Sequence, residues 1–130
     1  PISDASKEAV RQQYSGGASY FLFVGALHPR KNLVRLFQAF DVFRSTADTE
    51  VKLLIVGEKM FRTQAISKTY EGMKYKDEVV FCGRLNAEEL HRVTAAALAI
   101  TYVSYFEGFG IPIVEAFRCG TPVITSNVTS

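Results

Sequence analysis

Five short apolar runs, separated by longer stretches of mixed polarity, constrain the fold of this chain more than any other feature. The runs lie at residues 20–25 (YFLFVG), 52–57 (KLLIVG), 79–83 (VVFCG), 98–103 (LAITYV) and 122–126 (PVITS). They are rich in branched and aromatic residues, as strands buried on both faces are. Three of them end directly in glycine, where a turn into a helix can form. The sequence therefore predicts a set of buried parallel strands.

Helical patterns fill the gaps between these runs, at residues 31–46, 60–75, 86–99 and 110–120. The first pattern carries one apolar stripe, made up of Leu33, Leu36, Phe37, Phe40 and Phe43. The third begins with Asn86 as an N-cap and has Glu89 three residues on, an asparagine variant of the capping box. Strands that alternate with helices predict an α/β fold, a doubly wound parallel sheet of about five strands with right-handed crossovers.

The two ends of the chain do not follow this alternation. Residues 3–14 read as a helix capped by Ser3 or Asp4, and the SGGAS stretch after it reads as a flexible joint. The last residues, TSNVTS, follow a strand without a helix to cover it. We therefore expect a piece of a larger protein. Residues 1–18 would be the end of a preceding domain with its linker, and residues 19–130 part of one α/β domain.

Composition excludes several classes of protein. A net charge of +2 is too small to indicate nucleic-acid binding. No apolar run approaches the roughly 20 residues of a membrane span, and the polar start of the chain does not resemble a signal peptide. Cys82 and Cys119 lie in apolar contexts typical of buried free thiols, which indicates a reducing compartment. His28 and His91 are far apart in the sequence, and we expect no metal site.

The stretch FEGFGIPIVEAF, residues 106–117, joins two carboxylates to a glycine turn at the start of a helix. It follows a predicted strand, so it lies at the edge of the sheet where such folds bind ligands. Backbone N–H groups from Gly108 to Ile111 can bind a phosphate, whereas Glu107 and Glu115 can accept hydrogen bonds from sugar hydroxyls. Two simpler interpretations stay open. Glu107 could merely complement the helix dipole, and Glu115 could pair with Arg118.

A cationic pair follows the first strand at the same predicted edge. Arg30 and Lys31 could neutralise a diphosphate, although a solvated turn is the alternative. Lys31 lies at a helix start, where the dipole disfavours a cation, and this favours a ligand. The sequence lacks both G-x-G-x-x-G after a strand and the P-loop pattern G-x-x-x-x-G-K-[ST]. A nucleotide-sugar site fits these residues better than a dinucleotide site.

Four motifs together resemble a known family. They are VGALHPRKNL, LLIVGEK, VVFCGRLNAEEL and SYFEGFGIPIVEAFRCGTPVITSN, and they occur in order between residues 20 and 130. They resemble the C-terminal, donor-binding domain of retaining GT-B glycosyltransferases, the glycosyl transferases group 1 family. The E-x₇-E element, with glycines inside it and GTPV after it, is the most specific part. The resemblance implies a Rossmann-like fold, the C-terminal half of a GT-B fold, here truncated.

The resemblance also implies roles for matching residues. Glu107 resembles the glutamate that contacts the transferred sugar, and Glu115 the one that holds the ribose hydroxyls. Lys31 with Arg30 resembles the basic pair on the diphosphate, which would stabilise the leaving group. The backbone expected to border the sugar and diphosphate comprises Gly25, Gly108, Phe109, Gly110 and Ile111. The turn of Gly83, Arg84 and Leu85 would lie against the nucleobase. One departure is Ala26, where many members have arginine, so that Arg30 substitutes for that charge or the phosphate contact is weaker.

The enzyme implied is a retaining hexosyltransferase that moves a mannosyl or glucosyl group from a nucleotide-diphosphate sugar. It needs no cofactor and no metal. Its acceptor, a glycan or a lipid-linked glycan of polysaccharide biosynthesis, would bind an N-terminal domain that this stretch lacks, so the chain by itself should be inactive. Nucleotide sugars imply a cytoplasmic enzyme, and many relatives work at the membrane surface. Two alternatives are an epimerase of GT-B type acting on a UDP-sugar and a non-catalytic α/β interaction module.

Overall fold

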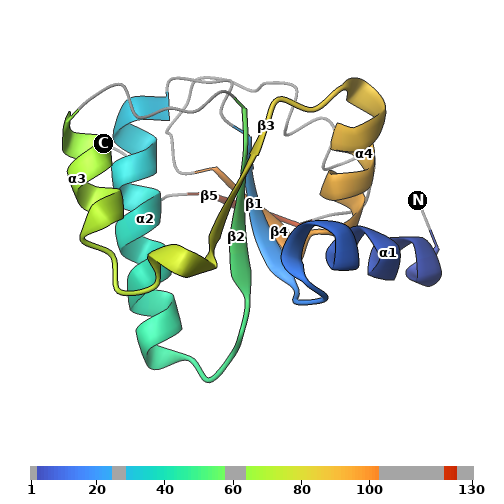
Figure 1. The fold of residues 1–130 in the computed structure, drawn as a ribbon, viewed down its shortest axis with the longest axis horizontal. Coiled ribbons are helices and arrows are strands. Elements are labelled where there is room, and N and C mark those ends of the chain that lie inside the picture. Colours follow the sequence, from blue (N-terminus) through green and yellow to red (C-terminus); the bar gives the residue numbers. More distant parts are fainter. Residues whose placement is uncertain (1–2, 25–28, 58–63, 103–121, 126–130) are drawn as a thin grey trace.

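A computed structural model describes residues 3–24, 29–57, 64–102 and 122–125 of the chain, with the backbone alone at 29–32, 102 and 123–125 (Figure 1). Strands and helices alternate along it. In chain order the elements are α1 (Asp4–Ser15), β1 (Tyr20–Val24), α2 (Pro29–Thr46), β2 (Lys52–Val56), α3 (Gln64–Glu71), the 3-10 turn η1 (Lys76–Glu78), β3 (Val79–Gly83), α4 (Ala87–Ala96), β4 (Ala99–Tyr102) and β5 (Val123–Thr125).

The described strands form one parallel sheet in the order β3-β2-β1-β4-β5. Leu22 of β1 pairs with Leu54 of β2 on one side and with Ile100 of β4 on the other, so β1 lies in the middle of the sheet. The chain builds outward from β1 to β3 and then returns to the far side of β1. This arrangement confirms the predicted doubly wound α/β fold, and each predicted strand is found to within one residue at its ends.

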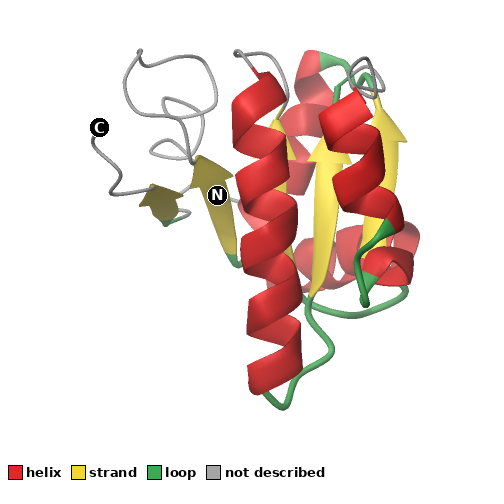
Figure 2. Ribbon diagram, turned by 90° about the vertical axis from the view of Figure 1, so that its left-hand side faces the viewer, coloured by secondary structure: helices red, strands yellow, loops and turns green. Residues whose placement is uncertain are grey.

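The reversal of strand order decides which helices cover which face. Right-handed crossovers place the helices of the outward run on one face and the helix of the return run on the other. Accordingly α2 and α3 pack side by side on one face, whereas α1 packs beside α4 on the opposite face (Figure 2). The sheet is thus the middle of three layers.

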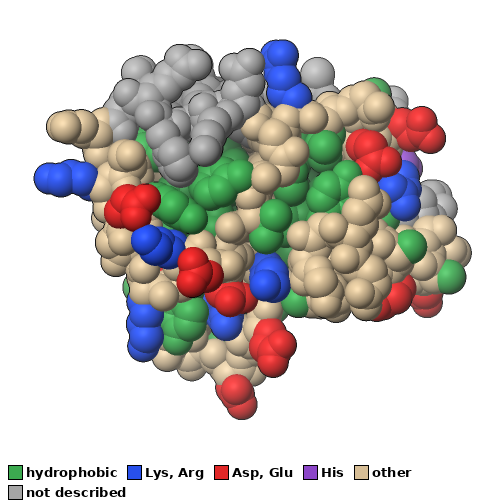
Figure 3. Space-filling model, in the orientation of Figure 1, with side chains coloured by type: hydrophobic (Ala, Val, Ile, Leu, Met, Phe, Trp, Pro, Cys, Tyr) green, Lys and Arg blue, Asp and Glu red, His purple; other side chains and the backbone are tan. Residues whose placement is uncertain are grey.

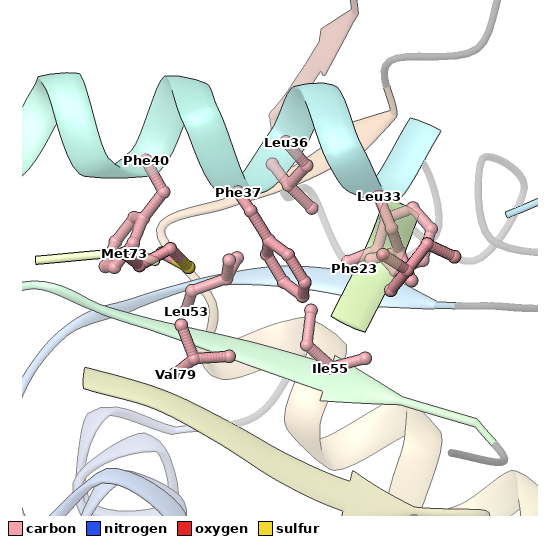
Figure 4. Packing of buried hydrophobic residues seen from close by; sticks show 10 residues of the cluster. Phe23, Leu33, Leu36, Phe37, Phe40, Leu53, Ile55, Met73 and Val79 are labelled. Atoms are coloured by element: carbon pink, nitrogen blue, oxygen red, sulfur yellow. The ribbon is translucent and has the colours of Figure 1, made fainter. Parts of the chain in front are cut away.

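Each face of the sheet has its own apolar core. Alternate residues of a strand point to opposite faces, so Phe23 faces α2 while Leu22 faces α4. The predicted stripe of α2 supplies the first core, and Figure 4 shows its side chains directed at β1 and β2. The buried members of that core are Phe23, Leu33, Leu36, Phe37, Phe40, Leu53, Ile55, Ile66, Met73 and Val79. The second core consists of Val10, Tyr20, Leu22, Leu54, Val56, Val93, Ala96 and Ile100.

Helix α1 belongs to the second core. Val10 is fully buried there, and Tyr14 packs against the same cluster. Ser3 caps the helix, as predicted, by accepting the Ser6 backbone N–H at 3.1 Å. The SGGAS stretch, expected to be a flexible joint, forms a hydrogen-bonded turn. The Gly17 N–H donates to the Arg11 carbonyl at 3.0 Å and the Ser15 hydroxyl to the Ala18 carbonyl. The assignment of residues 1–18 to a preceding domain stays a prediction.

Two helices are shorter than their sequence patterns, because distant groups take over their hydrogen bonds. The pattern at 60–75 becomes a helix that ends at Glu71, since the Asp41 carboxylate accepts the N–H groups of Lys74 at 3.0 Å and Tyr75 at 2.8 Å. The pattern at 86–99 ends at Ala96, because the Leu98 N–H donates to the Tyr20 carbonyl at 2.8 Å and draws the chain into the sheet.

Strand β3 forms one edge of the described sheet. In the space-filling view, apolar side chains gather over β3 between the two helix layers (Figure 3). Basic and acidic side chains mix below them on this face. At the start of β3, Glu78 of η1 pairs with Arg44 at 3.2 Å and with Lys52 at 3.4 Å. This mixture on the visible face gives no continuous basic stripe of the kind that follows a nucleic-acid backbone.

Candidate functional site: the carboxyl edge of the sheet

The carboxyl edge of this sheet contains a topological switch point between β1 and β4. These two strands are neighbours, yet the chain leaves β1 for the α2 face and reaches β4 from α4, on the opposite face. In open α/β sheets ligands bind at this place.

The predicted cations follow β1 at this switch point. Arg30 and Lys31 lie in the first turn of α2, which begins at Pro29, a residue favoured at that position. The first turn of α2 has no acidic residue to offset them. The backbone thus places both residues at the positive end of a helix dipole. Their side chains, and Gly25, lie outside the described residues.

The predicted E-x₇-E element follows β4 on the other side of the switch point. Strand β4 ends at Tyr102, and β5 returns parallel beside it, with Tyr102 opposite Thr125. The intervening predicted site residues, all outside the described part of the chain, are Glu107, Gly108, Phe109, Gly110, Ile111 and Glu115. Their roles stay predictions, as does the helix predicted at 110–120.

The turn after β3 is described in full. Gly83 has φ 72°, a left-handed conformation that suits glycine. Its carbonyl accepts the Gly57 N–H at 2.8 Å, which ties the ends of β2 and β3 together. A Cβ atom built at Gly83 would meet no atom of the described residues within 4 Å, so among these residues there is space on that side of its backbone. A planar group could approach this backbone closely.

The next residues divide between surface and core. Arg84 is exposed at the sheet edge, whereas Leu85 is half-buried and packs against the second core. Asn86 then caps α4, because its side chain accepts the Glu89 backbone N–H at 2.8 Å. The turn that was predicted to meet a nucleobase is therefore held in place by the packing of Leu85 against the second core and by the Asn86 cap of α4.

Tyr14 and Glu89 form a contact at this turn that sequence reasoning did not identify. The Tyr14 hydroxyl donates to Glu89 Oε1 at 2.6 Å, and Arg92 Nη1 donates to Glu89 Oε2 at 3.0 Å. The hydrogen bond from Tyr14, followed by Arg92, lowers the pKa of Glu89. Burial, followed by the bond to Glu89, raises the pKa of Tyr14 to about 12. Glu89 was predicted only as a capping residue, and the sequence carried no signal that would link it to Tyr14.

The shifted pKa of Tyr14 predicts a difference at alkaline pH. Because the folded-state pKa lies above the ordinary value of 10.0, the stability that Tyr14 contributes is fully present below pH 10 and is lost as pH rises towards about 12. Tyr14→Phe should therefore flatten the decline in the free energy of unfolding between pH 10 and 12, because the variant has no phenol to ionise in the folded state. Urea denaturation across this range measures the slope. Equal slopes in the variant and the wild type would contradict the assignment.

Two other expectations concern thiols and metals. Cys82 is half-buried in β3, and burial raises its pKa to about 11, which keeps the thiol protonated and unreactive. Cys119 lies outside the described residues. Where the structure describes side chains, no three His, Cys, Asp or Glu residues are grouped as metal ligands would be.

None of the described helices combines the length and the apolar character of a membrane span.

Sequence comparison assigns the chain to a family. The model of the family named Glycosyl transferases group 1 matches residues 6–130. The chain belongs to this family. The match begins inside α1 and includes the switch point and the turn at Gly83. The resemblance found in the four motifs is thereby confirmed.

Two O-antigen enzymes are among the curated proteins that are similar to this chain. O-antigen chain mannosyltransferase B of Escherichia coli is 34% identical over 131 residues, which cover 100% of this chain and 34% of that protein. O-antigen chain mannosyltransferase RfbU of Salmonella typhimurium is 33% identical over 110 residues, covering 85% of this chain and 30% of that protein. The chain thus spans about a third of the length of these relatives.

Solved structures share the fold. HepE of Anabaena, crystallised with UDP-glucose, has a TM-score of 0.76 and 25% identity over 97% of this chain and 35% of its own. WaaG, a glycosyltransferase involved in lipopolysaccharide biosynthesis, has a TM-score of 0.77 and 26% identity over 98% of this chain and 34% of its own. The chain therefore has the predicted α/β fold, and it matches about a third of each of these GT-B glycosyltransferases.

Proposed function

We propose that this chain is the donor-binding part of a retaining glycosyltransferase that moves a hexosyl group, mannosyl or glucosyl, from a nucleotide-diphosphate sugar to a glycan or a lipid-linked glycan. One observation carries the proposal. Strands β1 and β4, which come directly before the two predicted donor segments in the sequence, are neighbours in the sheet. The family, and relatives named as mannosyltransferases, support a transferase that uses an activated sugar.

The geometry suits a ligand that lies along the sheet edge. Gly83 ends β3, two strands away from β1, which corresponds to about 10 Å across the sheet. One extended ligand can span that distance. Its base would lie against the backbone of Gly83 and Arg84, and its diphosphate at the start of α2, beside Lys31. HepE, which shares the fold, was crystallised with UDP and with UDP-glucose.

The remaining roles follow the family resemblance. Glu115 would accept hydrogen bonds from the ribose, and Glu107 would contact the transferred sugar. Backbone N–H groups from Gly108 to Ile111 would bind the diphosphate at a helix N-terminus. Charge on the leaving diphosphate would be stabilised by Lys31 and Arg30 without a metal ion.

The rest of a longer protein would complete the enzyme. The relatives are about three times the length of this chain, so the acceptor would bind residues beyond it. We propose a cytoplasmic enzyme of polysaccharide biosynthesis that meets lipid-linked acceptors at the membrane surface. By itself the 130-residue chain should bind nucleotide weakly and transfer no sugar.

A calorimetric titration of the full-length enzyme tests the proposal. UDP, GDP and ADP would each be titrated, free and as their glucose and mannose conjugates, into the wild type and Glu115→Ala. One base should bind best, and Glu115→Ala should weaken it about 10- to 100-fold, because a carboxylate that accepts ribose hydroxyls makes strong hydrogen bonds.

Glu50→Ala serves as the matched control. Glu50 is exposed and precedes β2, so it lies at the opposite edge of the sheet. This variant should bind like the wild type. Absence of binding by the full-length wild type to every nucleotide would refute the transferase. The anomeric form of the product, read by NMR, would separate retention from inversion, and epimerised donor without transfer would favour the epimerase.

A further inference from the structure

We propose that Tyr14 and Glu89 are positioning residues for the nucleobase end of the donor site, an inference that rests on the proposed function. Together they would hold the turn from Gly83 to Asn86 in the conformation that binds the donor. Neither residue needs to touch the ligand. Tyr14 would act through Glu89, and Glu89 through the start of α4.

The contacts place both residues beside that turn. Glu89 lies three residues after Asn86, in the first turn of α4, and its backbone N–H is the group that Asn86 caps. Its side chain is held at 2.6 Å by Tyr14, which belongs to α1, 75 residues away in the sequence. The start of α4 is thus fixed by its own cap and by a second helix.

Packing connects Tyr14 to the same turn by a second route. The Tyr14 ring and the Leu85 side chain both pack on the second core, where Cys82 of β3 joins them. Leu85 therefore fixes the turn to the second core, to which α1 also contributes, and the Tyr14–Glu89 bond fixes the start of the helix that follows the turn. At Gly83, no atom of the described residues lies within 4 Å of a Cβ position.

The bond is poorly placed to serve stability alone. Helices α1 and α4 are already joined by buried packing, since Val10 and Val93 are both fully buried in one core. The Glu89 side chain keeps 31% of its surface exposed, and partly solvated pairs contribute little to folding. The short Tyr14–Glu89 bond lies at the start of α4, directly after the turn from Gly83 to Asn86. We infer that it restricts the conformation of this turn. A turn that is already ordered loses less entropy when a ligand binds.

Kinetics of the full-length enzyme distinguish positioning from a structural role. Tyr14→Phe keeps the ring and removes only the hydroxyl. It should raise the KM for the nucleotide sugar and the Kd for the free nucleotide about tenfold, because a less ordered turn loses more entropy when the ligand binds. It should leave kcat unchanged, because the turn lies away from the reacting atoms. Glu89→Ala should have the same effect, and the double variant should be no worse than either single variant.

Conservative and control variants complete the test. Glu89→Gln keeps an oxygen that can accept from Tyr14, so its KM should stay close to that of the wild type. If Tyr14→Phe does not fold, the comparison of Glu89→Gln with Glu89→Ala still tests the inference. Tyr70→Phe is the matched control, because the Tyr70 hydroxyl donates to the Lys76 carbonyl at 3.4 Å on the α3 face of the sheet. It should leave KM unchanged.

The outcomes separate this inference from the proposed function. A higher KM in Tyr14→Phe and Glu89→Ala at constant kcat, with Glu89→Gln near the wild type, would support positioning. Variants that lose thermal stability but keep the wild-type KM would overturn the inference and leave the transferase intact. A wild-type enzyme that neither binds nor transfers any nucleotide sugar would refute the proposed function, and the inference with it.

Discussion

Replacement of Lys31 by alanine in the full-length enzyme should lower kcat by about 10²–10³-fold, the loss typical of removing one preorganised group that stabilises transition-state charge. Lys31 lies in the first turn of α2, where the helix dipole disfavours a cation. Its removal should therefore raise the free energy of unfolding by about 0.3–1 kcal/mol while activity falls. Steady-state kinetics and urea denaturation measure the two opposite effects.

Arg35→Ala is the matched control for this prediction. Arg35 lies on the same helix, four residues further on, and is exposed. A loss of charge there should change neither kcat nor stability by much, since exposed charges away from a site have small effects. If Lys31→Ala kept the wild-type kcat, the proposed contact with the leaving diphosphate would be wrong, whatever the nucleotide affinity.

Phe37→Ala should cost about 3–5 kcal/mol in the free energy of unfolding, the largest stability effect that we expect in this chain. Phe37 is fully buried between α2 and the sheet, and its ring lies 5.8 Å from that of Tyr70 in α3. Figure 4 shows it directed at Leu53 and Ile55 of β2. Truncation would leave a cavity in the middle of the first core, bordered by three elements. Chemical denaturation followed by circular dichroism measures the loss.

Val42→Ala on the same helix provides the comparison. The Val42 side chain is 63% exposed, so its truncation removes little buried surface, and alanine is the better helix former. Its stability should stay within about 0.5 kcal/mol of the wild type. A Phe37→Ala variant as stable as Val42→Ala would contradict the packing of α2 described above.

The two predictions concern different parts of one helix. The start of α2 lies at the switch point of the sheet, where the proposed function requires a charge that the helix dipole disfavours. The middle of α2 packs in the first core. A substitution that changes activity without loss of stability should therefore fall in the first turn, and one that destabilises the fold should fall on the stripe.

The strands and the apolar stripe could be predicted from sequence because they depend on local patterns. A strand buried on both faces needs a continuous apolar run, and a helix on a sheet needs apolar residues on one side. The caps at Ser3 and Asn86 were predicted for the same reason, since each side chain bonds a backbone N–H three residues away. These contacts require no knowledge of the rest of the chain.

Helix ends and the surroundings of the site depended on residues far apart in sequence. Helix α3 ends early because Asp41, more than thirty residues before, accepts the N–H groups of Lys74 and Tyr75. Helix α1 read as a separate segment, yet it packs on α4 because the return of the chain to β4 brings α4 to the same face. No local pattern contains this information.

The predictions for the candidate site also divide into local properties and long-range contacts. Sequence by itself determined which chemistry we predict, because the charges of Lys31 and Glu115 and the backbone freedom of Gly83 are properties of single residues that follow predicted strands. Only the tertiary structure decided that the strands before Lys31 and before Glu107 are neighbours, that Gly83 lies two strands away, and that Tyr14 meets Glu89. The physical reason is that pairing between distant strands and helices follows from how the whole chain buries its apolar faces, which no short stretch specifies.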